Sequence, residues 1–167
     1  MKKVLSFALA LAMMLSLAAC APKKTAKTPE ELKVLYTESI NGARDAETNE
    51  YLPCITAKED QFADVILPMV TVSDDNSSAY AVAISPMNMQ AYGIAAVMPL
   101  EGKEDDVKAG LQGFIDLQKQ NFEQYLPDQK EIANAAKLEV LADGTVLLVM
   151  CEDQDTVFAA IKAAIEK

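Results

Sequence analysis

Apolar residues recur at helical spacing near the start of the chain, directly after a strong helix-start signal. Thr28 can cap a helix, Pro29 suits its first turn, and Glu31 completes a capping box. The pair Asn41-Gly42 is typical of a helix end. The pattern predicts a helix over about residues 28–41, whose inward side carries Leu32, Leu35, Tyr36 and Ile40.

Three later segments also carry apolar stripes at helical spacing: residues 60–70, 104–125 and 156–165. Pro127 ends the long middle helix, and one further turn is predicted over 128–133. We expect Gly110 and Gly113 to weaken that helix and to permit close packing on the sheet. The inward positions predicted for the three helices in turn are Phe62, Val65, Ile66 and Met69; then Val107, Leu111, Phe114, Ile115, Leu117, Gln118, Phe122 and Tyr125; then Val157, Ile161, Ala164 and Ile165.

Four short segments have the composition and alternation of strands. Residues 79–85 place Tyr80, Val82 and Ile84 on one side and small residues on the other. A linker over 86–90 joins them to a second strand over 92–98, and this pattern predicts a hairpin. Residues 138–141 and 145–151 form a second hairpin around Asp143-Gly144, a favoured tight turn.

The order of these elements predicts the fold class. Each hairpin is followed by a helix, so the chain contains two strand-strand-helix units. We predict an α+β domain with a four-stranded antiparallel sheet, the helices 104–125 and 156–165 on one face, and an N-terminal helix in addition. Residues 43–78 are unassigned apart from the short helix and a turn over 73–78.

The first twenty residues resemble an export signal. Lys2 and Lys3 precede an apolar run over 4–17, and small residues up to Ala19 stand before Cys20. The run is shorter than the roughly 20 residues that a spanning helix needs. This arrangement matches the lipobox of bacterial lipoproteins, in which the chain is cut between Ala19 and Cys20 and the thiol receives a diacylglyceryl group. An ordinary secretory signal with a chance cysteine is the alternative.

These observations divide the chain into three parts: a lipoprotein signal peptide (1–19), a lipidated basic tether (20–27) and a single extracytoplasmic domain (28–167). Two acyl chains anchor a protein stably to a membrane. The predicted location is therefore the extracytoplasmic face of the cell membrane. The tether lysines suit an anionic surface, although a generic solvated linker explains them equally well.

Charge and cysteine content limit the chemistry. The formal net charge is −10, which argues against nucleic acid as a partner because no basic stripe is present. Cys54 and Cys151 are candidates for a disulfide outside the cytoplasm, or else are small buried hydrophobic residues. Reactive thiols and general acid–base catalysis most often involve histidine, and the sequence contains none.

Two further groupings raise the question of metal binding. Acidic clusters at 104–106 and 152–155 stand where helices begin, and we interpret them as charges that stabilise helix N-termini. The methionines suit packing better than soft-metal binding. They are Met87, Met89, Met98 and Met150. We therefore assign no catalytic residues, no metal ligands and no cofactor.

The motif Tyr125-Leu-Pro-Asp-Gln, with Ile132-Ala-Asn134 and the hairpin over 137–150, resembles a family of Gram-positive bacterial lipoproteins that carry an uncharacterised domain of unknown function. The resemblance covers roughly residues 80–165. It implies a lipobox and an extracytoplasmic address, and it implies no activity and no catalytic residues. Members often have an acidic residue near the start of the second strand, where this chain has Tyr92-Gly93.

Three classes of function stay open. A non-catalytic binding or scaffolding module of the cell envelope, which meets a protein, peptide or wall polymer, is the favoured one because histidine is absent. The alternatives are an envelope hydrolase that uses carboxylates and a small solute-binding lipoprotein. A chain of this size lacks a second lobe that could close on a solute.

Overall fold

The computed structural model describes residues 27–87 and 89–167. The predicted signal peptide, the cleavage and lipidation positions Ala19 and Cys20, and all of the tether except Lys27 lie outside the described residues. Within the described part, no helix combines the length and the apolar character needed to cross a membrane.

Four strands form one antiparallel sheet, as predicted. They are β1 (Ser77–Ile84), β2 (Gly93–Pro99), β3 (Lys137–Val140) and β4 (Val146–Met150), and their order in the sheet is β1-β2-β4-β3. Each hairpin pairs as the sequence predicted, and β2 pairs with β4 at the centre. The predicted α+β class and the four-stranded antiparallel sheet are confirmed.

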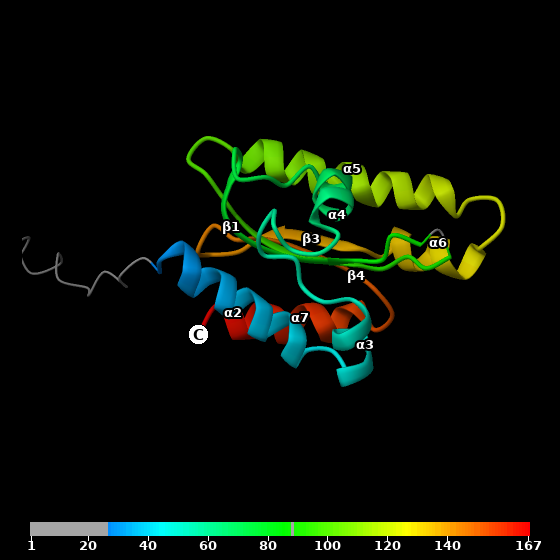
Figure 1. The fold of residues 1–167 in the computed structure, drawn as a ribbon. Helices are drawn as coiled ribbons and strands as arrows, with labels where there is room; N and C mark the ends of the chain where they lie inside the picture. Colours follow the sequence, from blue (N-terminus) through cyan, green and yellow to red (C-terminus); the bar gives the residue numbers. More distant parts are fainter. Residues whose placement is uncertain (1–26, 88) are drawn as a thin grey trace, which may run out of the picture.

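The helices cover both faces of this sheet (Figure 1). On one face lie α4 (Ala63–Val70), α5 (Glu104–Asn121) and α6 (Pro127–Asn134). On the other lie α2 (Pro29–Gly42) and α7 (Gln154–Ile165), and the short helix α3 (Ala46–Tyr51) follows α2. The prediction that the helices 104–125 and 156–165 share one face is therefore wrong, because α5 and α7 lie on opposite sides.

Strand composition explains why two helix layers are needed. Alternate side chains of a strand point to opposite faces, and in β1, β2 and β4 both sets are mainly apolar and buried. We name the sides after their main helices. The α5 face carries Tyr80, Val82, Ile84, Val97, Val146, Leu148 and Met150. The α2 face carries Ala79, Ala81, Ile94, Ala96, Leu147 and Val149. A sheet that is apolar on both faces must be covered on both.

The two strand-strand-helix units are therefore alike along the chain but are not related by a rotation. A rotation that exchanges the neighbouring antiparallel strands β2 and β4 has its axis perpendicular to the sheet. Such a rotation leaves each helix on its own face. Since α5 and α7 lie on opposite faces, no such axis relates the two units.

The N-terminal helix begins as predicted. The Thr28 hydroxyl accepts from the Glu31 amide at 3.3 Å, and the Glu31 carboxylate accepts from the Thr28 amide at 2.7 Å. Tyr36 on this helix is fully buried, and its hydroxyl shares a 2.7 Å hydrogen bond with that of Thr145. This bond joins α2 to the β3–β4 hairpin. Burial raises the pKa of Tyr36 above its ordinary value.

Several predicted inward positions are wrong at helix ends. The buried residues of α4 are Ala63, Ile66, Leu67 and Val70, whereas Phe62 and Val65 are 61% and 50% exposed. Phe62 only caps this helix, with φ of 67°. The long helix ends at Asn121, so Tyr125 lies beyond it and is 77% exposed. Leu117 is on the outer side of the same helix and is exposed.

Two glycines allow close approaches on the α5 face. A Cβ atom at Gly110 would lie 2.6 Å from the Val70 carbonyl oxygen, so this glycine lets α5 approach α4 rather than the sheet. A Cβ atom at Gly93 would lie 2.6 Å from the Phe114 ring, so this glycine lets α5 approach the sheet. Gly113 has open space around it. The expected role in packing against the sheet is therefore wrong for both helix glycines.

The free edge of β1 is partly covered by the segment after α3. Ile55 exchanges both backbone hydrogen bonds with Val82, at 2.8 and 2.9 Å. Pairing stops on one side because the next partner position is Pro53, which has no N–H. It stops on the other side because the Ala57 amide donates to the Asp60 carboxylate. One bridge therefore fixes the segment across the sheet edge.

Candidate binding surface at the end of the sheet

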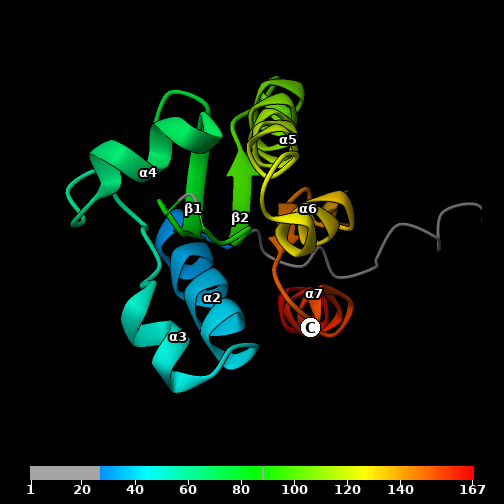
Figure 2. The same cartoon turned by 90° about the vertical axis from the view of Figure 1, so that its right-hand side faces the viewer.

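The surface features of most interest gather at one end of the sheet. This end contains the C-terminal end of α2, α3, the β1–β2 loop and the N-terminal end of α7 (Figures 1 and 2). We call it the distal end, because the first described residues and the C-terminus lie at the other end. Two adjoining hollows and one partly buried arginine define it.

The larger hollow is acidic and has a volume of about 620 Å³. Asp45, Glu47 and Glu50 supply its charge, and Tyr51 and Tyr92 supply aromatic rings. Asp45 caps α3 by accepting from the Thr48 amide at 2.8 Å, and these hydrogen bonds lower the pKa of its carboxyl. We call this feature the acidic hollow; its lining is Asp45, Glu47, Thr48, Glu50, Tyr51, Leu52, Gln90 and Tyr92.

The smaller hollow is apolar, with a volume of about 220 Å³. It lies beside the end of β1, between α3 and the start of α4. We call it the apolar groove; its lining is Tyr51, Leu52, Pro53, Ile55, Phe62, Ile66, Ile84 and Pro86. Tyr51 and Leu52 line both hollows, so the acidic hollow and the apolar groove adjoin each other.

Arg44, the single arginine of the sequence, fixes the chain around these hollows. Its Nη1 donates to the Leu52 carbonyl oxygen at 3.1 Å and to the Tyr92 hydroxyl at 3.3 Å. Its Nη2 donates to Asn41 Oδ1 at 2.8 Å and to Cys54 Sγ at 3.8 Å. All four terminal donors therefore bind neutral acceptors of the protein itself. The Nε atom is buried with no hydrogen-bond partner.

The candidate disulfide residues lie on the same side of the sheet but on different elements. Cys54 precedes the Ile55 bridge outside β1, whereas Cys151 follows β4, and β2 lies between β1 and β4. Both thiols are free in the structure.

Burial keeps the thiols and the phenol of this region neutral. It raises the pKa of Cys151 to about 11, with a further contribution from the carboxylate of Asp153. It also raises the pKa of Cys54, against the opposing influence of the Arg44 guanidinium. The pKa of Tyr92 is raised by the same cause, although Arg44 again acts in the other direction. None of these groups is activated as a nucleophile near neutral pH.

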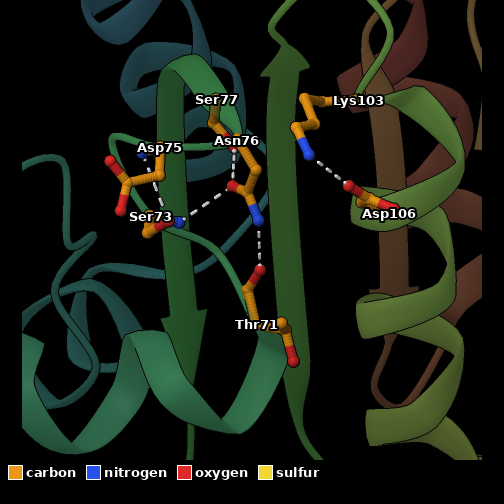
Figure 3. A network of polar contacts seen from close by, with 7 residues as sticks. All are labelled: Thr71, Ser73, Asp75, Asn76, Ser77, Lys103 and Asp106. Atoms are coloured by element: carbon orange, nitrogen blue, oxygen red, sulfur yellow. Dashed lines mark hydrogen bonds and ion pairs between the residues drawn. The ribbon is translucent and has the colours of Figure 1, made fainter.

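A third hollow, of about 600 Å³, lies under α4 near the other end of β1. A hydrogen-bonded turn forms one wall (Figure 3). Asn76 Oδ1 accepts from the Ser73 amide at 3.0 Å and from the Ser77 hydroxyl at 2.7 Å, and its Nδ2 donates to the Thr71 carbonyl oxygen at 2.7 Å. The predicted turn over 73–78 is confirmed up to Asn76, and β1 begins at Ser77. Its polar side chains are used in holding the turn itself.

The remaining candidate residues are dispersed. Glu104, Asp105, Asp106 and Asp155 stand in the first turns of α5 and α7, where the helix-end interpretation placed them. Among the described residues, no group of three or more potential ligands is positioned to hold a metal ion. The methionines do not form a site: Met150 packs on the α5 face and Met98 on the α2 face, while Met87 and Met89 are exposed.

Sequence reasoning missed the Arg44 contacts and the apolar groove. Both depend on residues 43–62, which carry no sustained periodic pattern. A lone arginine directly after a predicted helix end was the only available signal, and it does not reveal the partners of that arginine.

The described domain is thus a three-layer α+β domain with a recessed distal end. The sequence pattern of the family described as Domain of unknown function (DUF4358) matches residues 58–151, more than half of the chain. The chain belongs to this family. The match spans α4, all four strands, α5 and α6, and leaves out α2, α3 and α7. Comparisons with curated proteins and with solved structures find no match.

Proposed function

We propose that this chain is a lipid-anchored extracytoplasmic lipoprotein whose domain is a non-catalytic binding module of the cell envelope. In this proposal Cys20 carries the lipid and residues 21–27 form the tether. The observation that carries the proposal is the position of the recessed surface, which lies at the opposite end of the domain from the start of the described chain (Figure 1).

The helix α2 provides this geometry. It begins at Pro29, directly after the proposed tether, and has 14 residues. At about 1.5 Å per residue, it carries the chain roughly 20 Å before Gly42. The acidic hollow and the apolar groove follow at its far end. An anchor at Cys20 would therefore leave these surfaces accessible to a partner away from the membrane.

The chemistry of the distal end supports binding over covalent catalysis. The two thiols and the Tyr92 phenol have raised pKa values, so they are held neutral. The terminal donors of Arg44 are all engaged within the domain. What the distal end offers to another molecule is shape, exposed apolar area and negative charge.

Two measurements test the proposal. Metabolic labelling with a palmitate analogue should mark the protein, and Cys20→Ser should abolish the label. A photo-crosslinking amino acid at Tyr51, which is 59% exposed at the distal end, should give a discrete adduct in intact cells. The matched control is the same amino acid at Val34, which is 57% exposed on α2.

Each measurement can overturn its part of the proposal. Undiminished labelling of Cys20→Ser would disprove the lipid anchor. Adducts of equal yield at Tyr51 and Val34, or none at Tyr51, would disprove a binding surface at the distal end. Turnover of a wall-derived substrate that is lost on replacing Glu47 and Glu50 would show that the domain is an enzyme.

A further inference from the structure

The apolar groove has large exposed hydrophobic side chains in its lining. Tyr51 and Phe62 are 59% and 61% exposed, and they line the groove together with the almost fully buried Ile66 and Ile84. Clustered exposed apolar residues beside a recess are typical of a contact surface. A single exposed residue would carry no such meaning.

The backbone at Phe62 has an unusual conformation. Its φ of 67° is in the left-handed region, which a bulky aromatic residue rarely adopts because of steric strain. The Phe62 side chain is exposed, whereas Ile66 and Leu67 of the helix that follows are buried. The strained backbone at Phe62 therefore belongs to an exposed aromatic residue in the lining of the groove.

Charge next to the groove selects the kind of occupant. At Tyr51 and Leu52 the groove adjoins the acidic hollow, where Glu47 and Glu50 are exposed and form no ion pair within the described part of the chain. The nearby cation, Arg44, has its terminal donors directed to neutral acceptors. An anionic ligand would meet repulsion here, whereas a basic side chain would find two unpaired carboxylates.

The volumes and the lining residues of the two hollows fit a peptide segment. The groove of about 220 Å³ is too small for a folded domain and large enough for one or two apolar side chains. The acidic hollow adjoins it, and the exposed ring of Tyr51 in its lining favours cations as well. A peptide that fills both hollows must therefore have an apolar residue next to a basic one.

We propose that the distal end binds an extended peptide segment of a partner protein in which a large apolar residue, held in the apolar groove, stands next to a lysine or arginine, held in the acidic hollow. This inference deepens the proposed function and rests on it for the choice of binding end. Apolar contacts in the groove contribute to the affinity for the peptide. The carboxylates of Glu47 and Glu50 favour basic peptides over acidic ones.

The test is fluorescence anisotropy with the described domain, residues 27–167, and three short labelled peptides. The first alternates lysine with leucine or phenylalanine, the second replaces its lysines with glutamate, and the third replaces its apolar residues with serine. We expect the first to bind at least about tenfold more tightly than either of the others, since each lacks one of the two features.

Substitutions then locate the site. Phe62→Asn suits the left-handed backbone while removing the ring, and should weaken binding of the first peptide by about tenfold. The double variant Glu47→Gln with Glu50→Gln should weaken it several-fold and reduce its dependence on salt. Matched controls are Val65→Ser, an exposed apolar residue of the same helix outside the groove lining, and Glu38→Gln on α2. Both controls should bind like the parent domain.

Several results would overturn the inference. They are equal binding of all three peptides, no binding of any, or binding that Phe62→Asn and the glutamine variant leave unchanged. A dimer in sedimentation that dissociates in Phe62→Asn would show that a second copy occupies the groove instead. If crosslinking at Tyr51 succeeds in cells while all three peptides fail, the proposed binding end stands and the peptide chemistry is wrong.

Discussion

The two faces of the sheet are covered in different ways. On the α5 face, bulky strand residues meet α4, α5 and α6, and glycines permit the closest approaches. On the α2 face, the strand residues nearest α2 are small, and the helices α2 and α7 provide the large side chains, among them Tyr36, Phe158 and Ile161. On the α5 face, large side chains of both strands and helices fill the core. Under α2, large side chains of the helices fill the space that the small strand residues leave.

The region matched by the family covers one of these two helix layers and leaves out the other. Residues 58–151 include every helix of the α5 layer and neither helix of the α2 layer. Yet alternate apolar side chains of β1, β2 and β4 point to the α2 face and are buried there. The matched region by itself would therefore leave the apolar α2 face of the sheet uncovered. The stability of the folded domain must come from the α2 layer as well as the α5 layer.

The largest expected effect comes from removing the α2 layer. A fragment of residues 58–151 should not form a cooperatively folded domain, because Ile94, Leu147 and Val149 would lose their cover. Circular dichroism and thermal unfolding, compared with residues 27–167, would measure this. A fragment that unfolds with a sharp transition as a monomer would show that the α5 layer suffices.

The close helix contact on the α5 face gives the next largest effect. Gly110→Ala should destabilise the domain by about 1–3 kcal/mol, since its Cβ would clash with the backbone at Val70. Gly113→Ala, three residues along the same helix, should stabilise it by up to about 1 kcal/mol because the site is open and alanine favours helix. Urea unfolding of both variants provides the check; the same sign for both would contradict the assigned contact.

Substitutions at two neighbouring residues of β1, Ala81 and Val82, compare the packing of the two faces directly. Ala81→Val should destabilise by about 1–2 kcal/mol because α2 packs over a fully buried alanine. Val82→Ala should destabilise by a similar amount for the opposite reason, a cavity on the α5 face. If Ala81→Val instead raises the unfolding midpoint, the α2 face has unused space.

The smallest effect concerns the link between α2 and the second hairpin. Tyr36→Phe should cost about 1 kcal/mol near neutral pH, because Thr145 loses its buried partner. The raised pKa of Tyr36 favours the neutral phenol in the folded state. Its contribution is therefore complete below the unfolded-state pKa of about 10 and is lost as pH rises above it.

This pH dependence has a direct control. Between about pH 9 and pH 11, the free energy of unfolding of the parent domain should fall more steeply than that of Tyr36→Phe. Identical slopes would show that Tyr36 ionises as readily in the folded protein as in the unfolded chain, contrary to its burial.

The sequence by itself determined every helix and strand except α3, and the pairing of both hairpins. Alternation around Tyr80, Val82 and Ile84, the Asp143-Gly144 turn and the capping box at Thr28 are local signals, and each produced the structure it predicted. The lipobox at Cys20 is equally local; it stays a prediction, because it lies outside the described residues.

Only the tertiary structure decided which face each helix covers and where the candidate site forms. The apolar stripe of a helix such as α7 shows which side is buried, but it fits either face of a sheet that is apolar on both. The site, in turn, depends on contacts between residues far apart along the chain, such as Arg44 with Tyr92 and Tyr51 with Met87. Such contacts follow from the path of the chain after α2, which no local periodicity specifies.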